Sequence, residues 1–378
     1  MSGTRPVLID ASNLHVGGGV QVGASLIDEF VRLPDAPWLR TATILVSSEV
    51  HANLSAAARG LPGLRIHDSR PYKIRQWMPR RRRHDVSFLV FGPEYGWPRA
   101  RRRIVGFADV RSVFPVPAGE ASSRRQQAFL ALRGFVSRLL TRTADRLVVE
   151  SPAIAKQLIR RRVADADHID VVSNSYHGIF DEPEHWTPLP RALPDTAPDT
   201  HVLCYVARAY PHKNHEFLPR LASEAAGLGA KLRFVVTLTA AEWESMSEKF
   251  RSCCENIGPI SIDVVPTVYG AVDGAIFPSL LEAFSAAPLE AMRMGRVLFA
   301  SDRDFVRDVC GDAPVYFDPL DAAGAAKAVV ETLSSPDRVA AHVELGLRLA
   351  DQLPSSADRA ERVAAILQAE VTRIGAGR

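Results

Sequence analysis

The sequence predicts an α/β protein with two Rossmann-like, doubly wound parallel-sheet domains. Short apolar runs typical of strands alternate with helical periodicity along most of the 378 residues. The alternation is interrupted at residues 181–200, which are rich in proline and acidic residues and have no periodicity. The length and the 47% apolar content suit two domains with buried cores. We therefore expect domains at 1–180 and 201–355, a linker at 181–200, and a C-terminal helix at 356–378 that packs back on the first domain.

Each predicted strand is an apolar, often β-branched run bounded by turn signals. The runs of the first half occupy residues 6–10, 41–47, 64–68, 86–92, 103–109, 146–151 and 168–175. Those of the second half occupy residues 202–207, 232–238, 261–266, 274–279, 297–301 and 314–318. Between them, spacings such as Val22, Leu26 and Phe30 predict amphipathic helices. Strands that alternate with helices in this way predict parallel sheets with covering helices.

The strongest candidate site is PSLLEAFSAAPLEAM at residues 278–292, where Glu282 and Glu290 flank a run of small residues. Pro288 suits a first helical turn, and Gly295 stands where the helix should end. The preceding loop then lies at the carboxyl end of a parallel strand, where such sheets bind ligands. Backbone N–H groups at a helix start can also receive phosphate or sugar oxygens. The segment favours an anionic, hydroxyl-rich ligand, although glutamates at this spacing also occur on solvated helix faces.

A second candidate site is VLCYVARAYPHKNHEFLPRLA at residues 202–222. A strand-like run ends at Arg208, a turn with Pro211 follows, and Lys213 comes just before a predicted helix. The planar fork of arginine and the point charge of lysine both suit a diphosphate. A basic loop that faces water is the alternative interpretation.

Near the N-terminus, Gly17, Gly18 and Gly19 follow a predicted strand, and we expect them to form a flexible loop. Consecutive glycines allow a backbone to approach a ligand closely. The run GGGVQVG comes too late after the strand and has the wrong spacing for the G-x-G-x-x-G fingerprint of dinucleotide-binding folds. The loop therefore indicates a ligand contact or a simple turn, without a specific cofactor.

Together these stretches resemble the retaining nucleotide-sugar glycosyltransferases of family 4, the glycosyl transferases group 1, which have the GT-B fold with two domains facing a central cleft. The resemblance rests on Glu282 and Glu290 with seven residues between them, on RAYPHKN around Arg208 and Lys213, and on the glycine run. It is strong from about 200 to 320 and extends to VVSNSYHGIF at 171–180. It implies transfer of a hexose, for example mannose or glucose, from a nucleotide diphosphate sugar to a glycan or lipid-linked acceptor. The implied setting is cell-surface polysaccharide or lipopolysaccharide assembly.

The resemblance also implies roles for individual residues. It gives Glu282, Arg208 and Lys213 catalytic roles, without a metal or another cofactor. It implies donor contacts by Gly18, Gly19, Arg208, Lys213, Glu282, Phe284, Ser285, Ala286 and Glu290, with Glu290 on the ribose hydroxyls. Ser285 stands where the family has glycine, which narrows the approach to the sugar. In the first domain, Asp109 and Glu94 occupy loops comparable with that of a family histidine that points at the sugar.

Charge divides the chain into a basic and an acidic half. Residues 1–180 hold 27 Lys and Arg against 15 Asp and Glu, a net charge of +12, whereas residues 181–378 hold 19 against 28, a net charge of −9. Clustered arginines attract anionic membrane surfaces, and they also attract nucleic acid. Because no nucleic-acid-binding motif is present, we expect no nucleic acid partner. We expect the basic domain to bind the acceptor or an anionic inner-membrane surface through Arg80, Arg81, Arg82, Arg83, Arg101, Arg102 and Arg103.

The remaining sequence features concern compartment and rival functions. The four cysteines form no disulfide or metal-ligand pattern, and neither an apolar run of membrane-spanning length nor a secretory leader is present. We expect a cytoplasmic protein that can associate peripherally with the cytoplasmic membrane face. Two rival functions remain open: a catalytically silent nucleotide-sugar-binding scaffold and a GT-B sugar-nucleotide epimerase.

Overall fold

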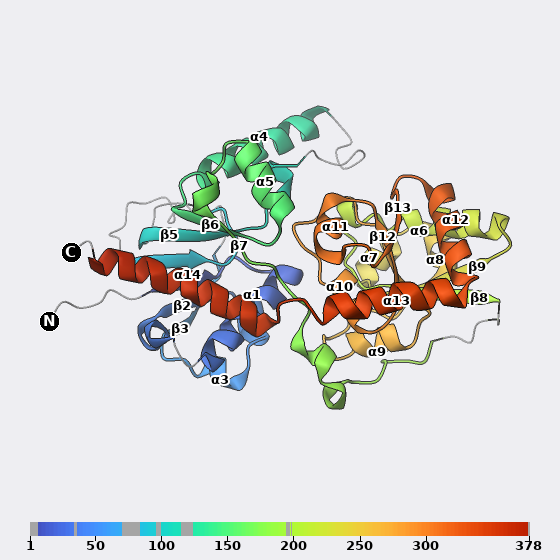
Figure 1. Cartoon of the computed structure of the whole chain (residues 1–378), viewed down its shortest axis with the longest axis horizontal. Helices are drawn as coiled ribbons and strands as arrows, with labels where there is room; N and C mark the ends of the chain where they lie inside the picture. The colour runs from blue at the N-terminus through green and yellow to red at the C-terminus, as the bar shows by residue number, and fades with distance from the viewer. Residues whose placement is uncertain are drawn as a thin grey trace. The chain divides into compact units, whose positions relative to one another are not determined.

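The computed structural model describes residues 7–33, 36–69, 84–95, 100–114, 124–193, 197 and 199–376 (Figure 1). The chain divides into two compact units. Unit 1 comprises residues 1–174 and 354–378, and unit 2 comprises residues 175–353. Each unit contains a sheet in which all the described strand pairs are parallel. The predicted α/β class with two parallel-sheet domains is therefore confirmed.

Unit 1 is built on a sheet with the strand order β3-β2-β1-β4-β5-β6-β7. The strands are β1 Leu8–Ala11, β2 Thr43–Val46, β3 Leu64–Ile66, β4 His84–Leu89, β5 Ala100–Phe107, β6 Arg146–Val149 and β7 Ile169–Val171. The α-helices are α1 Gly18–Arg32, α2 Ser48–Ala52, α3 Ala56–Arg59, α4 Arg124–Thr141, α5 Pro152–Arg160 and α14 Ser356–Ala376. Short 3-10 turns are η1 Pro37–Thr41, η3 Val110–Ser112 and η4 Ala166–His168.

The core of unit 1 lies between this sheet and the helices α1 and α14. Helix α1 buries the apolar residues Val20, Leu26, Ile27 and Phe30, which recur at helical spacing. The C-terminal helix α14 packs on α1 and on β4, and Figure 1 shows it running alongside α1. Its residue Leu367 is fully buried in the same cluster. Each such side chain contributes about 1.5–3 kcal/mol of burial free energy, which fixes the last helix to unit 1.

Unit 2 has a second sheet with the order β10-β9-β8-β11-β12-β13. The strands are β8 Thr200–Tyr205, β9 Lys231–Val236, β10 Cys254–Asn256, β11 Gly274–Phe277, β12 Val297–Ser301 and β13 Val315–Phe317. The α-helices are α6 Phe217–Gly227, α7 Ala240–Ser245, α8 Glu248–Cys253, α9 Val265–Gly270, α10 Ala287–Arg293, α11 Asp304–Cys310, α12 Ala322–Leu333 and α13 Pro336–Ala350. The 3-10 turns are η5 Gly178–Asp181, η6 Pro183–His185 and η7 Pro211–Lys213.

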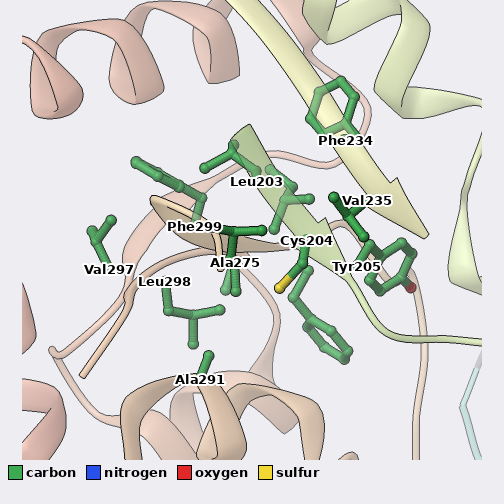
Figure 2. Packing of buried hydrophobic residues seen from close by; sticks show 14 of the residues in the cluster. Leu203, Cys204, Tyr205, Phe234, Val235, Ala275, Ala291, Val297, Leu298 and Phe299 are labelled. Atoms are coloured by element: carbon green, nitrogen blue, oxygen red, sulfur yellow. The ribbon is translucent and has the colours of Figure 1, made fainter. Parts of the chain in front are cut away.

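The core of unit 2 follows from the apolar runs of its central strands. Figure 2 shows Leu203, Cys204 and Tyr205 of β8 in one cluster with Phe234 of β9 and Phe299 of β12. Residues from helices that cover the sheet complete the cluster, among them the fully buried Leu289 and Ala291 of α10. The two central strands, β8 and β11, are therefore held rigidly at the point where the candidate loops leave the sheet.

The structure corrects two predictions of local structure. Residues 261–266 do not form a strand; Pro266 lies in the first turn of α9, whose residues Val265 and Val268 face the core. The outer neighbour of β9 is instead the three-residue strand β10, which was not predicted. The predicted loop of three glycines is also shorter, because α1 already begins at Gly18 and Gly17 alone turns the chain, with a φ of 66°.

The proline-rich stretch lies against unit 2 in the part that is described. Leu189 and Leu193 pack on the core of that unit. The Trp186 Nε1 donates to Ile179 O at 2.7 Å, and the Thr187 N donates to Asp263 O at 2.9 Å. Among the described residues, no helix combines the length and the apolar composition needed to cross a bilayer.

Candidate functional site

The candidate site of unit 2 lies where the strand order reverses. From β8 the chain continues outward to β9 and β10, whereas β11 starts a series that runs the other way through β12 and β13. At such a switch point the loops at the carboxyl ends of the two central strands diverge and leave a crevice where ligands bind. Here these loops are residues 206–216 and 278–286. They carry Arg208, Lys213, Glu282, Phe284, Ser285 and Ala286, six of the predicted donor residues.

Two of the three predicted catalytic residues form an ion pair across these loops. The Lys213 Nζ lies 2.5 Å from the Glu282 Oε1, and the side chains are only 13% and 9% exposed. The same Nζ lies 5.6 Å from the centre of the Phe277 ring. Charges this poorly solvated are stable only when they are paired. Lys213 and Glu282 therefore form one ion pair rather than two independent charges.

The hydroxyl of Tyr205, at the end of β8, fixes the backbone of both loops. It donates to Lys213 O at 2.9 Å, and the Ser279 Oγ lies 2.9 Å away. Because a hydroxyl has one proton, Tyr205 accepts the hydrogen bond of Ser279. A direct backbone bond from Leu280 N to His212 O, 2.8 Å long, joins the same two loops. The geometry of the Lys213–Glu282 pair is thus set by the strand ends beneath it.

Asn214 provides a third connection and was not selected from the sequence. Its backbone is left-handed, with a φ of 57°, a conformation that asparagine tolerates better than most residues. Its Nδ2 donates to Pro278 O at 3.2 Å and to Pro319 O at 3.0 Å. The side chain therefore links three strand-end loops, those that follow β8, β11 and β13.

The neighbouring His215 is a packing residue. It is 4% exposed, its ring lies against that of Tyr205 with 4.7 Å between the centroids, and it also contacts Phe250. Burial, assisted by the charge of Lys213, lowers the pKa of His215 to about 4. The imidazole is therefore neutral at pH 7 and adds no charge to the site.

Glu290, in the first turn of α10, is a buried carboxyl group. Its Oε2 lies 3.3 Å from the hydroxyl of Tyr269, which is itself 3.1 Å from Ala287 O. Burial raises the pKa of Glu290 to about 7, although Tyr269 and Lys213 act in the opposite direction. Near neutral pH the carboxyl group can therefore be in either protonation state. Of the residues before α10, Phe284 packs on the core, whereas Ser285 and Ala286 are half-buried.

Arg208 belongs to a different ion pair. Its Nε lies 2.8 Å and 3.0 Å from the two carboxylate oxygens of Glu242, and its side chain is 45% exposed. Glu242 closes a capping box with Thr239 at the start of α7. Burial acts to raise the pKa of Glu242, but hydrogen bonds from Thr239, Arg208 and Ala209 lower it to about 2. Glu242 was not among the predicted site residues, although Thr239-x-x-Glu242 is the recognisable signal of a capping box.

The predicted glycines Gly18 and Gly19 belong to unit 1, at the start of α1. A Cβ added to Gly18 would meet nothing within 4 Å, and one added to Gly19 would lie 3.6 Å from the Leu14 side chain and 3.7 Å from that of Phe91. The space around both residues therefore admits a side chain. The positive φ that favours glycine occurs at Gly17.

The arginines predicted for an acceptor or membrane surface fall into two groups. Arg80, Arg81, Arg82 and Arg83 lie outside the described residues. Arg101, Arg102 and Arg103 lie on β5. Arg102 binds Glu370 at 2.8 Å and Asp145 at 2.9 Å, and Arg103 lies 3.6 Å from Glu94. Arg101 is the exposed member of the β5 group.

Asp109 and Glu94, the carboxylates proposed for a sugar-facing loop of the first domain, both hold unit 1 together. The Asp109 Oδ2 accepts a hydrogen bond from the Ser137 Oγ at 2.6 Å. The Glu94 Oε2 faces the guanidinium of Arg103. Internal contacts therefore account for both side chains.

Two groups of side chains in the described part of the chain could hold a metal ion by distance alone. They are His15, Glu49 and Asp68, and the exposed Asp165, Asp167 and His168. The His15 Nδ1 lies 2.9 Å from Glu49 and the Nε2 lies 2.9 Å from Ser69 O, so both ring nitrogens face acceptors and must donate. Burial opposes the charged ring, but these hydrogen bonds raise the pKa of His15. These contacts join His15 to Glu49 of α2 and to the loop that carries Ser69.

Comparison with known proteins identifies a family for part of unit 2. Residues 200–335 match the family described as glycosyl transferases group 1, a segment that contains Arg208, Lys213, Glu282 and Glu290. The matched segment lies within unit 2. No curated protein matches the chain.

Solved structures are similar over the whole chain. Sucrose-phosphate synthase from Thermosynechococcus elongatus has a TM-score of 0.68 at 14% identity, with 100% of both chains covered. HepE from Anabaena, in complex with UDP-glucose, has a TM-score of 0.68 at 13% identity over 96% of this chain and 99% of its own. A glycosyltransferase from Rickettsia africae has a TM-score of 0.65 at 13% identity over 97% and 99%. At these identities the likeness concerns the fold, and it confirms the predicted GT-B fold.

Proposed function

We propose that this chain is a retaining, metal-independent GT-B glycosyltransferase of family 4. It transfers a hexose from a nucleotide diphosphate sugar to a glycan or lipid-linked acceptor in the assembly of a cell-surface polysaccharide or lipopolysaccharide. Residues 201–355 bind the donor, and residues 1–180 bind the acceptor. The observation that supports the proposal best is the Lys213–Glu282 pair beside the buried Glu290, at the switch point of unit 2 and within the matched segment.

In the proposed reaction, negative charge grows on the departing diphosphate as the glycosidic bond breaks. Lys213 and Arg208 stabilise that charge, since preorganised cations act most strongly where charge develops. Glu282 contacts the donor sugar, and backbone amides near Phe284, Ser285 and Ala286 bind sugar hydroxyls or phosphate. Glu290 accepts hydrogen bonds from the ribose hydroxyls. Gly18 and Gly19 approach the donor phosphates or the acceptor.

The ion pairs have a consequence for donor binding. Without a ligand, Glu282 neutralises Lys213 and Glu242 neutralises Arg208. A diphosphate can interact with either cation only if it shares that cation with its carboxylate partner. We infer that donor binding reorganises both pairs, and that the carboxylates hold the two cations in place beforehand. This preorganisation lowers the cost of ordering long side chains at the moment of binding.

The nucleotide base is inferred from similarity alone. HepE from Anabaena is described in complex with UDP and with UDP-glucose, at 13–15% identity to this chain. UDP-glucose is therefore the first donor to test, followed by other nucleotide diphosphate sugars.

The proposal is tested by donor binding and transfer with the purified full chain. Thermal-shift screening against nucleotide sugars should reveal the donor, because a ligand at 100 times its dissociation constant stabilises the folded state by about 2.7 kcal/mol. Glu290→Ala should then weaken nucleoside diphosphate binding by roughly 1.5–3 kcal/mol, the value of hydrogen bonds to a charged group. Glu224→Ala, an exposed glutamate of α6, is the matched control. Unchanged affinity in folded Glu290→Ala would remove Glu290 from the site.

The assay also separates the rival functions. A donor that binds but is neither hydrolysed nor transferred, over a panel of glycan and lipid-linked acceptors, would indicate a scaffold. Release of free nucleotide together with a changed sugar would indicate an epimerase. Product with inverted anomeric configuration, observed by NMR, would contradict the retaining mechanism.

A further inference from the structure

Helix α4 of unit 1 buries small or polar residues and exposes large apolar ones, whereas an ordinary surface helix buries its apolar face. Its buried residues are the small or polar Gly134, Ser137 and Thr141, at positions i, i+3 and i+7. The Ser137 Oγ donates to Asp109 at 2.6 Å, and a Cβ at Gly134 would lie 3.4 Å from the backbone of Ser112. The helix therefore packs on η3 through its small polar face.

Five large apolar side chains of α4 are exposed to solvent. They recur three or four residues apart and form one stripe, which we call the α4 stripe. The exposed fractions are 65% at Phe129, 62% at Leu132, 51% at Phe135, 41% at Val136 and 43% at Leu139. A contiguous exposed stripe of this kind, unlike scattered apolar residues, marks an interaction surface.

The charge around the stripe restricts its partner. Residues 124–142 contain five arginines and no acidic residue. In the part of the chain that the structure describes, no carboxylate pairs with Arg133, Arg138 or Arg142. A second copy of the chain would bring two such arginine sets together, and like charges disfavour that contact. The complementary partner is anionic and has an apolar interior.

A hollow beside the stripe brings arginine and apolar side chains together. Arg138 Nη1 donates to Ser112 O at 2.6 Å and Arg142 Nε donates to Arg162 O at 3.0 Å, and further N–H donors of both guanidinium groups remain available to a phosphate. It has a volume of about 340 Å³, is open to solvent, and is lined by Arg138, Arg142, Arg161, Phe135 and Leu139. Guanidinium groups recognise phosphate through their forked N–H donors. Apolar side chains at the edge of the hollow suit the first carbons of an acyl chain. The two kinds of side chain thus meet as phosphate and hydrocarbon do in a bilayer interface.

We propose that α4 is an interfacial helix through which unit 1 docks on a membrane that contains anionic phospholipid. The α4 stripe enters the boundary of the acyl region, and the arginines bind lipid phosphates, as in other amphipathic helices that lie in the membrane plane. This assignment goes beyond the proposed function and does not depend on it, because docking requires no catalysis.

Vesicle co-sedimentation with the full chain tests the proposal. Wild-type protein should bind vesicles of phosphatidylglycerol and phosphatidylcholine, bind phosphatidylcholine alone weakly, and dissociate in concentrated salt. The variant Phe129→Ser/Leu132→Ser/Phe135→Ser should bind about tenfold less tightly or worse, because it loses the buried apolar area. Ile66→Ser/Leu228→Ser, with side chains of similar exposure elsewhere, should bind as wild type does. Arg125→Gln/Arg133→Gln should bind less tightly and with a weaker salt dependence.

A second readout keeps the test independent of folding defects. In Leu132→Trp, the added fluorescence should shift to the blue with anionic vesicles and be quenched by brominated acyl chains, relative to wild type. No quenching, or equal sedimentation of the triple serine variant and wild type, would overturn the proposal. A triple serine variant that loses self-association in sedimentation velocity but retains vesicle binding would identify the stripe as a contact between copies, which also refutes it.

Discussion

The Lys213–Glu282 pair allows a quantitative test of whether the site is preorganised. Lys213→Met removes the ammonium but retains the length of the side chain, and it leaves a 9% exposed carboxylate without the cation that lay 2.5 Å away. At an effective dielectric constant of about 20, the gross attraction at that distance is roughly 6–7 kcal/mol. Desolvation of the two ions offsets much of it, and removal of one partner of a buried pair costs about 3–5 kcal/mol. We therefore expect unit 2 to lose about that much unfolding free energy.

Glu282→Gln should cost less, since an unpaired lysine can extend its long stem towards water. The double variant Lys213→Met/Glu282→Gln should recover much of the loss, because it contains no unpaired charge. The difference defines a coupling energy of about 2–4 kcal/mol, larger than exposed pairs provide. This coupling energy can be measured for unit 2 by urea unfolding, with hydrogen exchange of the β8 and β11 amides as the probe.

The control for this cycle is the surface pair Lys327–Glu331, with an N···O distance of 3.9 Å and side chains 74% and 48% exposed. Its coupling should be about 0.3–0.5 kcal/mol, as for other i,i+4 helix pairs. If the Lys213–Glu282 coupling is no larger than that of the control, the two loops are not held by this pair, and the argument for a preorganised site fails.

Three further predictions follow from the same contacts. Lys213→Ala and Arg208→Ala should reduce turnover more than donor affinity, because interactions that are stronger in the transition state act on rate; wild-type turnover in both variants would place the diphosphate elsewhere. Since the pKa of Glu290 is about 7, nucleoside diphosphate affinity should rise with pH through that value as the carboxylate forms, and Glu290→Gln should lose this component of the pH dependence in titration calorimetry. The pKa of Glu290 in the folded state also lies above the pKa of a glutamate in the unfolded chain, about 4.3, so the folded state binds more protons between these two pH values. The unfolding free energy of the wild type relative to Glu290→Gln should therefore fall as pH rises from about 4.3 to 7. If urea unfolding shows a constant difference between the two proteins over this range, the raised pKa is wrong.

Much of the candidate site could be predicted because its residues stand at strand ends. Arg208 and Lys213 follow one apolar run, and Glu282 follows another, so each loop could be located by local pattern alone. That these runs are neighbouring strands at a switch point depends on the strand order, which no local pattern encodes. The ion-pair partners of Lys213 and Arg208 could therefore not be predicted. In the structure Lys213 pairs with Glu282, and Arg208 pairs with Glu242, which lies 34 residues further along the chain.

The failure at residues 261–266 has a different physical cause. Ile262, Val264 and Val265 form an apolar run that is compatible with a buried strand or a buried helix, and periodicity cannot separate the two over so short a length. Pro266 was the informative residue, because proline suits a first helical turn and cannot donate within a sheet. The real neighbour of β9, β10, has only three residues, too few for an alternating pattern to be recognised.

Net charge and periodicity also required the structure before they could be interpreted. The net charge of +12 in residues 1–180 predicts a basic domain, but it does not distinguish free arginines from internally paired ones such as Arg102 and Arg146. The apolar spacing of α4 alone would predict a helix that turns its stripe towards the core. The structure buries Gly134 and Ser137 instead, since their small size allows close approach to η3. An apolar stripe therefore predicts burial, but the residues on the opposite face of the helix also decide whether that stripe packs on the core of the unit.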